Sequence, residues 1–222
     1  MEASILTKER FPLQLLQIPN PPEQLWVRGT LPIPETKCLT VVGSRALTPY
    51  GKESCEYLIG GLAGYPLSII SGLALGADAC AHEAALAVGI HTIGIPGSGL
   101  SDTVLYPRTN VDLANRILSA GGALVSEHPS DHQAQVQDFP SRNRIMVGMA
   151  DAVLVIEAGE KSGTLISARL AAEYDRDLLC VPHRIRDMNS AGSHQFIRLG
   201  AQLVSEPEHI LEALRIDVHE MF

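Results

Sequence analysis

The sequence predicts an α/β protein built on a mostly parallel, doubly wound sheet with helices on both faces. Short runs of β-branched and apolar residues alternate with longer amphipathic segments, and each run ends in Gly, Ser or Pro. This is the pattern of parallel strands that are joined by helices. Most of the runs are apolar throughout rather than alternating, so both faces of the sheet need a covering layer.

The expected boundaries follow these apolar runs and the turn residues between them. Strands are expected at Cys38–Gly43, Leu67–Ser71, His91–Pro96, Ala123–Glu127, Ala152–Glu157, Leu178–Pro182 and Gln202–Ser205. Helices are expected at Tyr50–Ala63, Gly76–Val88, Thr109–Ser119, Ser141–Met149, Thr164–Tyr174 and Glu208–Leu214. The Ser/Gly/Asn-rich stretch between His183 and His194 is expected to be a loop.

Residues 1–37 differ from the rest of the chain and are expected to form a proline-rich strap packed on the core. The prolines hold this segment extended and exclude a long helix, while Phe11, Leu15 and Trp26 need burial. The core domain is then 38–205, and residues 206–222 form an acidic C-terminal helix and tail.

Composition excludes several classes of protein. The chain has 222 residues, of which 45% are hydrophobic, enough for one sizeable core. No apolar run approaches the roughly 18 residues of a membrane span, and Met1–Arg10 lacks a secretory-type segment, so a cytoplasmic location is expected. The net charge of −8 argues against coating duplex DNA through a general positive field. The aromatic content of 5% disfavours an extended stacking platform.

Small residues follow four of the predicted strands, where a parallel sheet binds ligands. The turns are Gly43–Arg45, Ser71–Gly76, Pro96–Gly99 and Ser162–Thr164. Their backbone N–H groups and the helix starts behind them would form one crevice for an anionic ligand. No GxxxxGK[ST] is present and no GxGxxG follows the first strand, so a P-loop NTPase and a standard dinucleotide-binding dehydrogenase are both disfavoured.

Arginines near this crevice are the candidate phosphate ligands. Arg45 directly follows the first strand, from which a guanidinium can pair with a phosphate. The segment 139–145, FPSRNRI, adds a ring and two further arginines. Because residues two apart on a helix point roughly 200° from each other, we expect Arg142 to bind the ligand and Arg144 to pair with Asp151 or Glu157.

Other polar groups do not form a convincing catalytic or metal site. Asp78 and His82 are four apart on a predicted helix and could act as a base and its orienter or as two metal ligands, but a structural hydrogen bond between them is favoured. Four histidines give no complete ligand set, and four cysteines lack CxxC spacing and are expected to be buried: His128, His132, His183, His194, Cys38, Cys55, Cys80 and Cys180. No GxSxG elbow occurs. We therefore predict no catalytic residue, no metal and no cofactor.

Blocks along nearly the whole chain resemble one known family, the DNA-processing protein DprA, or Smf, family. They are Phe11–Leu13, Ile18–Pro22, Leu25–Gly29, Val42–Arg45 with Tyr50–Gly51, Ser71–Asp78 with Ala81–His82, Gly97–Gly99, Tyr106–Pro107, Ser126–Glu127, Phe139–Ile145, Ser162–Leu165 and Gly200–Ala201. The resemblance implies an extended Rossmann-like domain without enzyme activity that binds single-stranded DNA, forms a homodimer and helps to load a RecA-type recombinase in natural transformation and homologous recombination.

The resemblance also implies where DNA binds. The predicted DNA-binding residues, including three taken from the turns, are Gly43, Ser44, Arg45, Ser71, Gly72, Gly97, Phe139, Arg142, Asn143, Lys161, Ser162 and Gly163. The chain departs from the family pattern at Pro182-His183 and at His194. It also shows neither the N-terminal helical domain nor the C-terminal winged helix of many members, so it is expected to be a minimal or divergent member.

Two alternative functions use the same crevice. Rossmann-like phosphoribohydrolases split nucleoside monophosphates with a catalytic Glu near a turn that corresponds to Ser162–Thr164. Here Glu157 precedes that turn and Glu173 follows it, but Ala168 and Arg169 occupy the nearer positions. The other alternative is a sensor of a small nucleotide, because phosphate contacts do not reveal the length of a polymer.

Overall fold

The centre of the molecule is a parallel sheet whose strands are buried on both faces. In the computed structural model, which describes residues 2–159 and 162–217, a nine-stranded sheet has the order β1-β2-β6-β5-β4-β3-β7-β8-β9. The strands are β1 (Ser4–Thr7), β2 (Gln24–Gly29), β3 (Lys37–Val42), β4 (Leu67–Ser71), β5 (His91–Gly94), β6 (Ala123–Ser126), β7 (Ala152–Val155), β8 (Asp177–Cys180) and β9 (Gln202–Leu203). From β6 to β9 all neighbours are parallel. The order reverses between β3 and β7, so a crevice opens there at the carboxyl ends of the strands.

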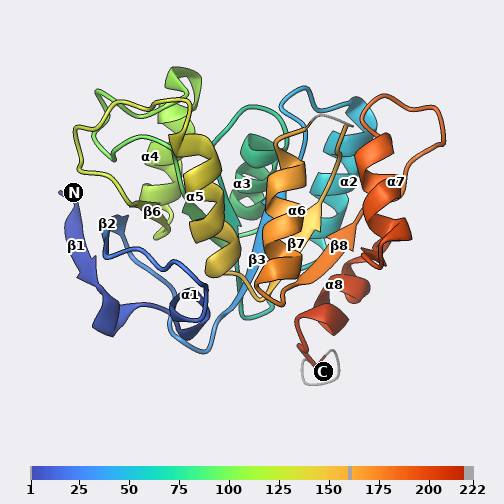
Figure 1. Cartoon of the computed structure of the whole chain (residues 1–222), viewed down its shortest axis with the longest axis horizontal. Helices are drawn as coiled ribbons and strands as arrows, with labels where there is room; N and C mark the ends of the chain where they lie inside the picture. Colours follow the sequence, from blue (N-terminus) through green and yellow to red (C-terminus); the bar gives the residue numbers. More distant parts are fainter. Residues whose placement is uncertain (1, 160–161, 218–222) are drawn as a thin grey trace.

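Helices cover both faces of the sheet, as Figure 1 shows. They are α1 (Leu13–Leu16), α2 (Pro49–Gly60), α3 (Ala77–Ala87), α4 (Val111–Ser119), α5 (Asp138–Gly148), α6 (Thr164–Glu173), α7 (Ala191–Arg198) and α8 (Pro207–Ala213), with short 3-10 turns at Lys8–Arg10 and Arg108–Asn110. Helices α1, α5, α6 and α7 pack on one face. Helices α2, α3 and α8 pack on the other, where α4 adjoins α3. The predicted extended Rossmann-like, doubly wound fold is confirmed.

Side chains that alternate along β3 build both cores. Leu39 and Val41 face α2, α3 and α8, whereas Cys38 and Val42 face α5 and α6. The buried Thr40 hydroxyl donates to the backbone oxygen of Met146 at 2.8 Å. The hydroxyl of Thr40 is therefore hydrogen-bonded although the residue is fully buried.

The N-terminal segment extends the same sheet. Strand β1 pairs antiparallel with β2, and β2 pairs antiparallel with β6. Helix α1 lies against α5, where Gly148 leaves room for Leu15. The predicted strap thus contains two strands that its prolines and short apolar runs did not indicate. The division of the chain at residues 37 and 205 stays a prediction.

Two helix boundaries differ from the expectation. Helix α7 occupies part of the expected loop between His183 and His194, because Phe196 is buried in the core despite its polar neighbours. Helix α5 begins at Asp138 rather than at Ser141, since a proline is tolerated in the first helical turn. Within the described ranges, no helix is both long and apolar enough to span a membrane.

Replacing Leu15 with alanine tests whether the N-terminal segment is an integral part of the fold. Leu15 is fully buried and Leu13, in the same short helix, is 73% exposed. We expect Leu15→Ala to lower the free energy of unfolding by about 2–5 kcal/mol and Leu13→Ala to change it by less than about 0.5 kcal/mol. Urea denaturation measures both. Equal midpoints for the two variants would show that the segment packs only loosely.

Candidate functional site

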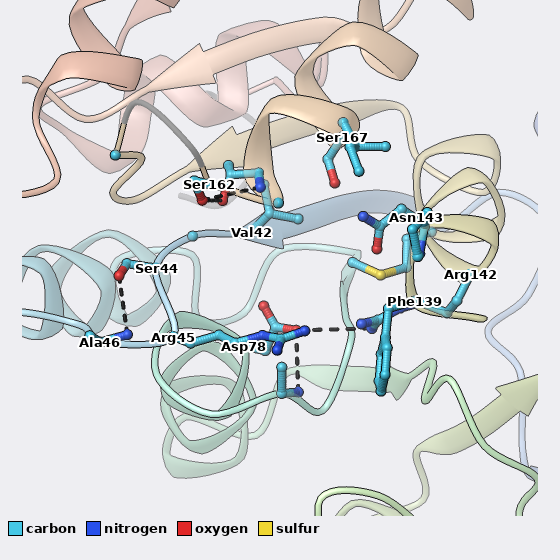
Figure 2. A pocket seen from close by; sticks show the side chains of 18 of the residues that line it. Val42, Ser44, Arg45, Ala46, Asp78, Phe139, Arg142, Asn143, Ser162 and Ser167 are labelled. Atoms are coloured by element: carbon cyan, nitrogen blue, oxygen red, sulfur yellow. Dashed lines mark hydrogen bonds and ion pairs between the residues drawn. The ribbon is translucent and has the colours of Figure 1, made fainter. Parts of the chain in front are cut away.

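The main cavity lies at the point where the strand order reverses. It has a volume of about 790 Å³. It is lined by Val42, Gly43, Ser44, Arg45, Ala46, Ala74, Asp78, Tyr106, Val136, Phe139, Pro140, Arg142, Asn143, Met146, Gly159, Ser162, Gly163, Thr164, Ile166, Ser167 and Asn189. They include residues that follow β3, β4 and β7, residues of α3, α5 and α6, and three from loops, and Figure 2 shows the cavity from close by.

The turn after β3 forms the floor of the cavity. Gly43 is required because a methyl group there would lie 2.6 Å from the Ala77 side chain at the start of α3. The Ser44 backbone oxygen accepts from Ala77 N at 3.0 Å, and its hydroxyl accepts from Ala46 N at 3.1 Å. This turn is thereby held against α3, and it projects the next side chain, Arg45, into the cavity.

Arg45 is exposed and lies beside an aromatic ring. Its guanidinium carbon is 5.4 Å from the centroid of Phe139, and Figure 2 shows the side chain extending from the β3 turn toward α5. Within the described residues, Arg45 forms no ion pair with a carboxylate. A cation that is free of carboxylates and stacked on a ring is well placed to bind a phosphate.

Two aromatic rings stand together at the cavity edge. Phe139, on α5, contacts Tyr106 with ring centroids 5.7 Å apart. Tyr106 is 48% exposed. Gly97 makes this arrangement fit, because a side chain there would lie 3.0 Å from the Phe139 ring. The exposed Tyr106 ring and the partly exposed Phe139 ring offer aromatic surface that can stack a nucleobase of any identity.

Arg142 forms the inner wall through a buried ion pair. Its Nη1 donates to the Ile95 backbone oxygen at 2.7 Å and lies 3.9 Å from Asp78 Oδ2. Burial lowers the pKa of Arg142, and the Asp78 carboxylate opposes that shift. Burial likewise raises the pKa of Asp78 while the Arg142 charge opposes it. The ion pair keeps both groups charged inside the protein.

Asp78 also holds the turn after β4. Its Oδ2 accepts from Gly72 N at 3.1 Å and from Ala74 N at 3.3 Å. Any side chain at Gly72 would overlap the Arg142 guanidinium. One carboxylate thus fixes both this turn and the arginine from the opposite face of the sheet.

The start of α6 supplies backbone N–H groups on the opposite side of the cavity. The Ser162 hydroxyl donates to Thr164 Oγ1 at 2.8 Å and accepts from Thr164 N at 3.2 Å. Gly163 is exposed, and a side chain there would meet nothing within 4 Å. A helix start with this geometry favours a negatively charged ligand. Lys161 lies outside the described residues.

The chain is similar to one protein family along nearly its whole length. The model of the family described as DNA recombination-mediator protein A matches residues 2–215. This chain belongs to that family. It is 43% identical over 211 residues to protein Smf of Escherichia coli, covering 95% of this chain and 56% of that protein. It is 39% identical over 201 residues to DprA of Streptococcus pneumoniae, covering 90% of this chain and 70% of that protein.

Solved structures show the same fold. The S. pneumoniae DprA structure has a TM-score of 0.88 and 36% identity, covering 96% of this chain and 74% of that one. The structure of DNA processing protein A from Helicobacter pylori has a TM-score of 0.84 and 29% identity, covering 97% of this chain and 98% of that one. A molybdenum cofactor binding protein from Rippkaea orientalis, at 18% identity and a TM-score of 0.57, shows the likeness of fold alone.

Most of the predicted DNA-binding residues meet in one cavity. The eight that line it are Gly43, Ser44, Arg45, Phe139, Arg142, Asn143, Ser162 and Gly163. Ser71, Gly72 and Gly97 do not line it. Ser71 donates to the Val41 backbone oxygen at 2.6 Å, and the two glycines make room for Arg142 and Phe139. Which of these residues contact DNA stays a prediction.

Sequence reasoning missed several residues of the cavity. Tyr106 and Asp78 stand in blocks that carry the family resemblance, which was the available signal for them. Asn189, by contrast, lies in the expected loop before α7 and reaches the cavity only through the folded chain. Its Nδ2 donates to the Ala46 backbone oxygen at 3.1 Å and to Glu157 Oε2 at 3.2 Å.

The expected partners of Arg144 were wrong. Its guanidinium pairs with Glu127 and donates to the Asn20 backbone oxygen at 2.8 Å. Asp151 instead accepts from Cys38 N at 2.8 Å, and Glu157 accepts from Thr48 and Asn189. Arg144 therefore joins α5 to the end of β6 and to the N-terminal segment.

The expected hydrogen bond between Asp78 and His82 was also wrong, because the two side chains have other partners. His82 is fully buried, and its Nδ1 lies 2.7 Å from Thr92 Oγ1, which itself donates to the Ile69 backbone oxygen. The Thr92 hydroxyl must then accept from His82, so the neutral ring carries its proton on Nδ1.

The two histidines that depart from the family pattern form backbone contacts. His183 Nε2 donates to the Ile156 oxygen at 2.8 Å, and His194 Nε2 donates to the His183 oxygen at 3.0 Å. They connect the ends of β7 and β8 to α7. Neither residue lines the main cavity.

Because His82 is buried, we expect the protein to become less stable in acid. Burial lowers its pKa to about 3, whereas the unfolded chain binds a proton near pH 6.5. The stabilising contribution is therefore present above about pH 6.5 and decreases by at most about 1.4 kcal/mol per pH unit as the pH falls toward 3. Urea denaturation between pH 4 and pH 7 should show a shallower pH dependence for His82→Gln than for the native protein. Parallel pH curves would contradict this role.

Proposed function

We propose that this chain binds single-stranded DNA through the cavity at the β3/β7 crossover and acts in DNA recombination. The observation that carries the proposal is Arg45. It is exposed, stacked on Phe139 and free of carboxylates in the part of the chain that the structure describes. It faces the start of α6 across the same cavity. Such a cavity offers both contacts that single strands need, namely charge for the phosphates and a ring for a base.

The relatives support the same proposal. The solved structure of DNA processing protein A from H. pylori, of which this chain covers 98%, is described as showing a single-stranded DNA binding mode. The chain spans about half the length of the E. coli relative, so the activities and partners of the longer proteins enter here as proposals. They include assembly into a homodimer and the loading of a RecA-type recombinase.

The surroundings of Glu157, the candidate catalytic carboxylate, favour a binding protein over a hydrolase. Glu157 is fully buried. Its oxygens accept from Thr48 N at 3.2 Å, from the Thr48 hydroxyl and from Asn189 Nδ2 at 3.2 Å. Gly51 packs directly against it. Glu157 therefore supports the start of α2, and we propose that the protein is not a phosphoribohydrolase.

Arg45→Ala should weaken the binding of single-stranded oligonucleotides by roughly 1–3 kcal/mol, because a charge-assisted contact to phosphate is lost. The matched control is Arg198→Ala, an exposed arginine on α7 that does not line the cavity. Fluorescence anisotropy with single- and double-stranded oligonucleotides at two salt concentrations measures the effect. The native protein should prefer the single strand and bind it less tightly at the higher salt.

Equal losses for Arg45→Ala and Arg198→Ala would place DNA elsewhere on the surface. No binding of either oligonucleotide at low salt, together with tight binding of mononucleotides, would favour the nucleotide sensor. Release of a free base from nucleoside monophosphates would favour the hydrolase.

Phe139 provides an independent test, because stacking does not depend on charge. Phe139→Leu keeps an apolar side chain but removes the ring, and we expect single-strand binding to weaken by roughly 1–3 kcal/mol. Phe139→Tyr should restore most of the affinity. Anisotropy and the melting temperature are measured together, so that a folding defect is recognised. Native affinity in a well-folded Phe139→Leu variant would exclude stacking at this position.

A further inference from the structure

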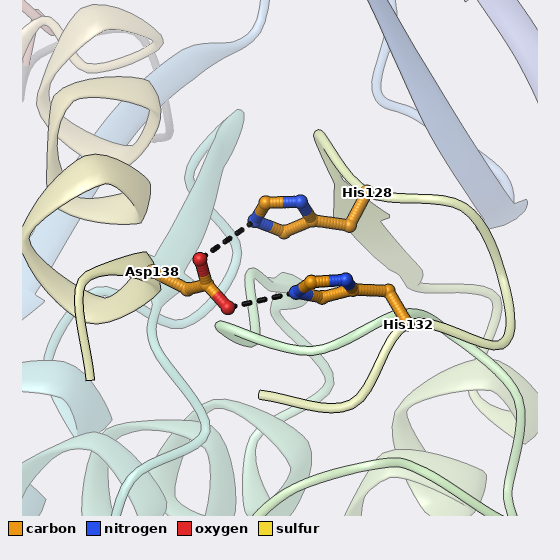
Figure 3. Close-up of side chains that lie close together, drawn as sticks. All are labelled: His128, His132 and Asp138. Atoms are coloured by element: carbon orange, nitrogen blue, oxygen red, sulfur yellow. Dashed lines mark hydrogen bonds and ion pairs between the residues drawn. The ribbon is translucent and has the colours of Figure 1, made fainter. Parts of the chain in front are cut away.

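Two histidines and an aspartate lie together beside the cavity, outside the residues assigned to DNA. His132 Nε2 is 2.7 Å from Asp138 Oδ2, and His128 Nε2 is 3.6 Å from Asp138 Oδ1. Figure 3 shows both rings turned toward the carboxylate, with each Nε2 facing a different oxygen. The candidate ligand atoms all lie within 4.8 Å of one another.

The donor types match a first-row divalent transition metal. Two imidazoles and one carboxylate, with a further position open to solvent, are a usual ligand set for Zn²⁺ and related ions, whereas Mg²⁺ prefers oxygen ligands alone. The two rings are stacked with centroids 4.0 Å apart and an interplanar angle of 17°. A small rotation of the rings would let both Nε2 atoms face one ion, with the proton on His132 Nε2 released on binding.

The three groups are reachable from solvent. An ion bound by His132 Nε2 would take the place of the proton that now joins this nitrogen to Asp138 Oδ2. The side chains of His128 and His132 are 25% and 24% exposed. An ion can therefore enter without the core opening.

Backbone contacts hold this arrangement in place. Asp138 Oδ2 also accepts from Gln135 N at 2.7 Å. The His132 backbone oxygen accepts from Gly99 N at 2.8 Å, and Ser130 accepts from Ser101 N at 2.8 Å. Gly99 has no room for a side chain because it packs on this loop. The ligands are thus supported from outside their own cluster, as metal sites generally are.

We propose that His128, His132 and Asp138 form a binding site for Zn²⁺ or a similar transition-metal ion. The sequence predicted no metal here, because its histidines gave no complete ligand set; the structure adds Asp138 as a third candidate ligand. A bound ion would fasten the loop of residues 128–137 to the start of α5. The residue after Asp138 is Phe139, so the ion would also fix the edge of the main cavity.

The experiment uses untagged protein that has been stripped with EDTA and dialysed. Zn²⁺ is titrated in competition with a chromophoric chelator, and Mg²⁺ serves as the ion that should not bind. We expect one Zn²⁺ per chain, and a loss of affinity of at least about tenfold in His128→Gln, His132→Gln and Asp138→Asn. Asp131→Asn, an exposed carboxylate of the same loop, is the matched control and should bind as the native chain does.

A second readout follows the loop itself. Hydrogen exchange of residues 128–137 should slow when Zn²⁺ is added to the native protein and to Asp131→Asn, but not when it is added to His128→Gln. His128→Gln removes only the longer of the two contacts to Asp138, so it tests the site with the least disturbance of the fold. No Zn²⁺ binding by the native chain, or equal binding by all variants, would overturn the proposal.

Discussion

The buried ion pair between Asp78 and Arg142 is the interaction on which the arrangement of the site depends. Asp78 belongs to α3 on one face of the sheet, and Arg142 belongs to α5 on the other. They meet over the ends of β4 and β5, where Asp78 holds the Gly72 turn and Arg142 binds the Ile95 oxygen. Removing one partner of such a pair would leave a buried charge, which typically costs about 3–5 kcal/mol.

This pairing also separates two kinds of arginine near the cavity. The charge of Arg142 is balanced by Asp78, and that of Arg144 by Glu127. Arg45 instead lies on the Phe139 ring. A chain with a net charge of −8 can therefore present a local positive charge where the strand order reverses, because screening keeps the distant acidic groups from cancelling it.

The loop of residues 128–137 positions the other edge of the cavity, and this loop is likewise held by residues from distant parts of the chain. Its backbone is fixed by the turn after β5, through Gly99 and Ser101, and its histidines meet the first residue of α5. The position of Phe139 thus follows from contacts among β5, this loop and α5. None of these contacts is visible as a short motif.

The sequence by itself determined the parallel sheet and the ends of its strands. Continuous apolar runs can be satisfied only by burial on both faces, and the small residues after them mark the turns. Strands β1 and β2 were not predicted, because their short apolar runs lie among prolines. Helix α7 was not predicted either, because its sequence is mostly polar and its buried residue Phe196 packs on the core only in the folded chain. In the site, the turn residues and Arg45 could be predicted from their place after a strand. The partners of Arg142, Arg144 and Asp138 could not, because an ion pair depends on which distant carboxylate or histidine the folded chain brings within a few ångströms, and only the tertiary structure decided that.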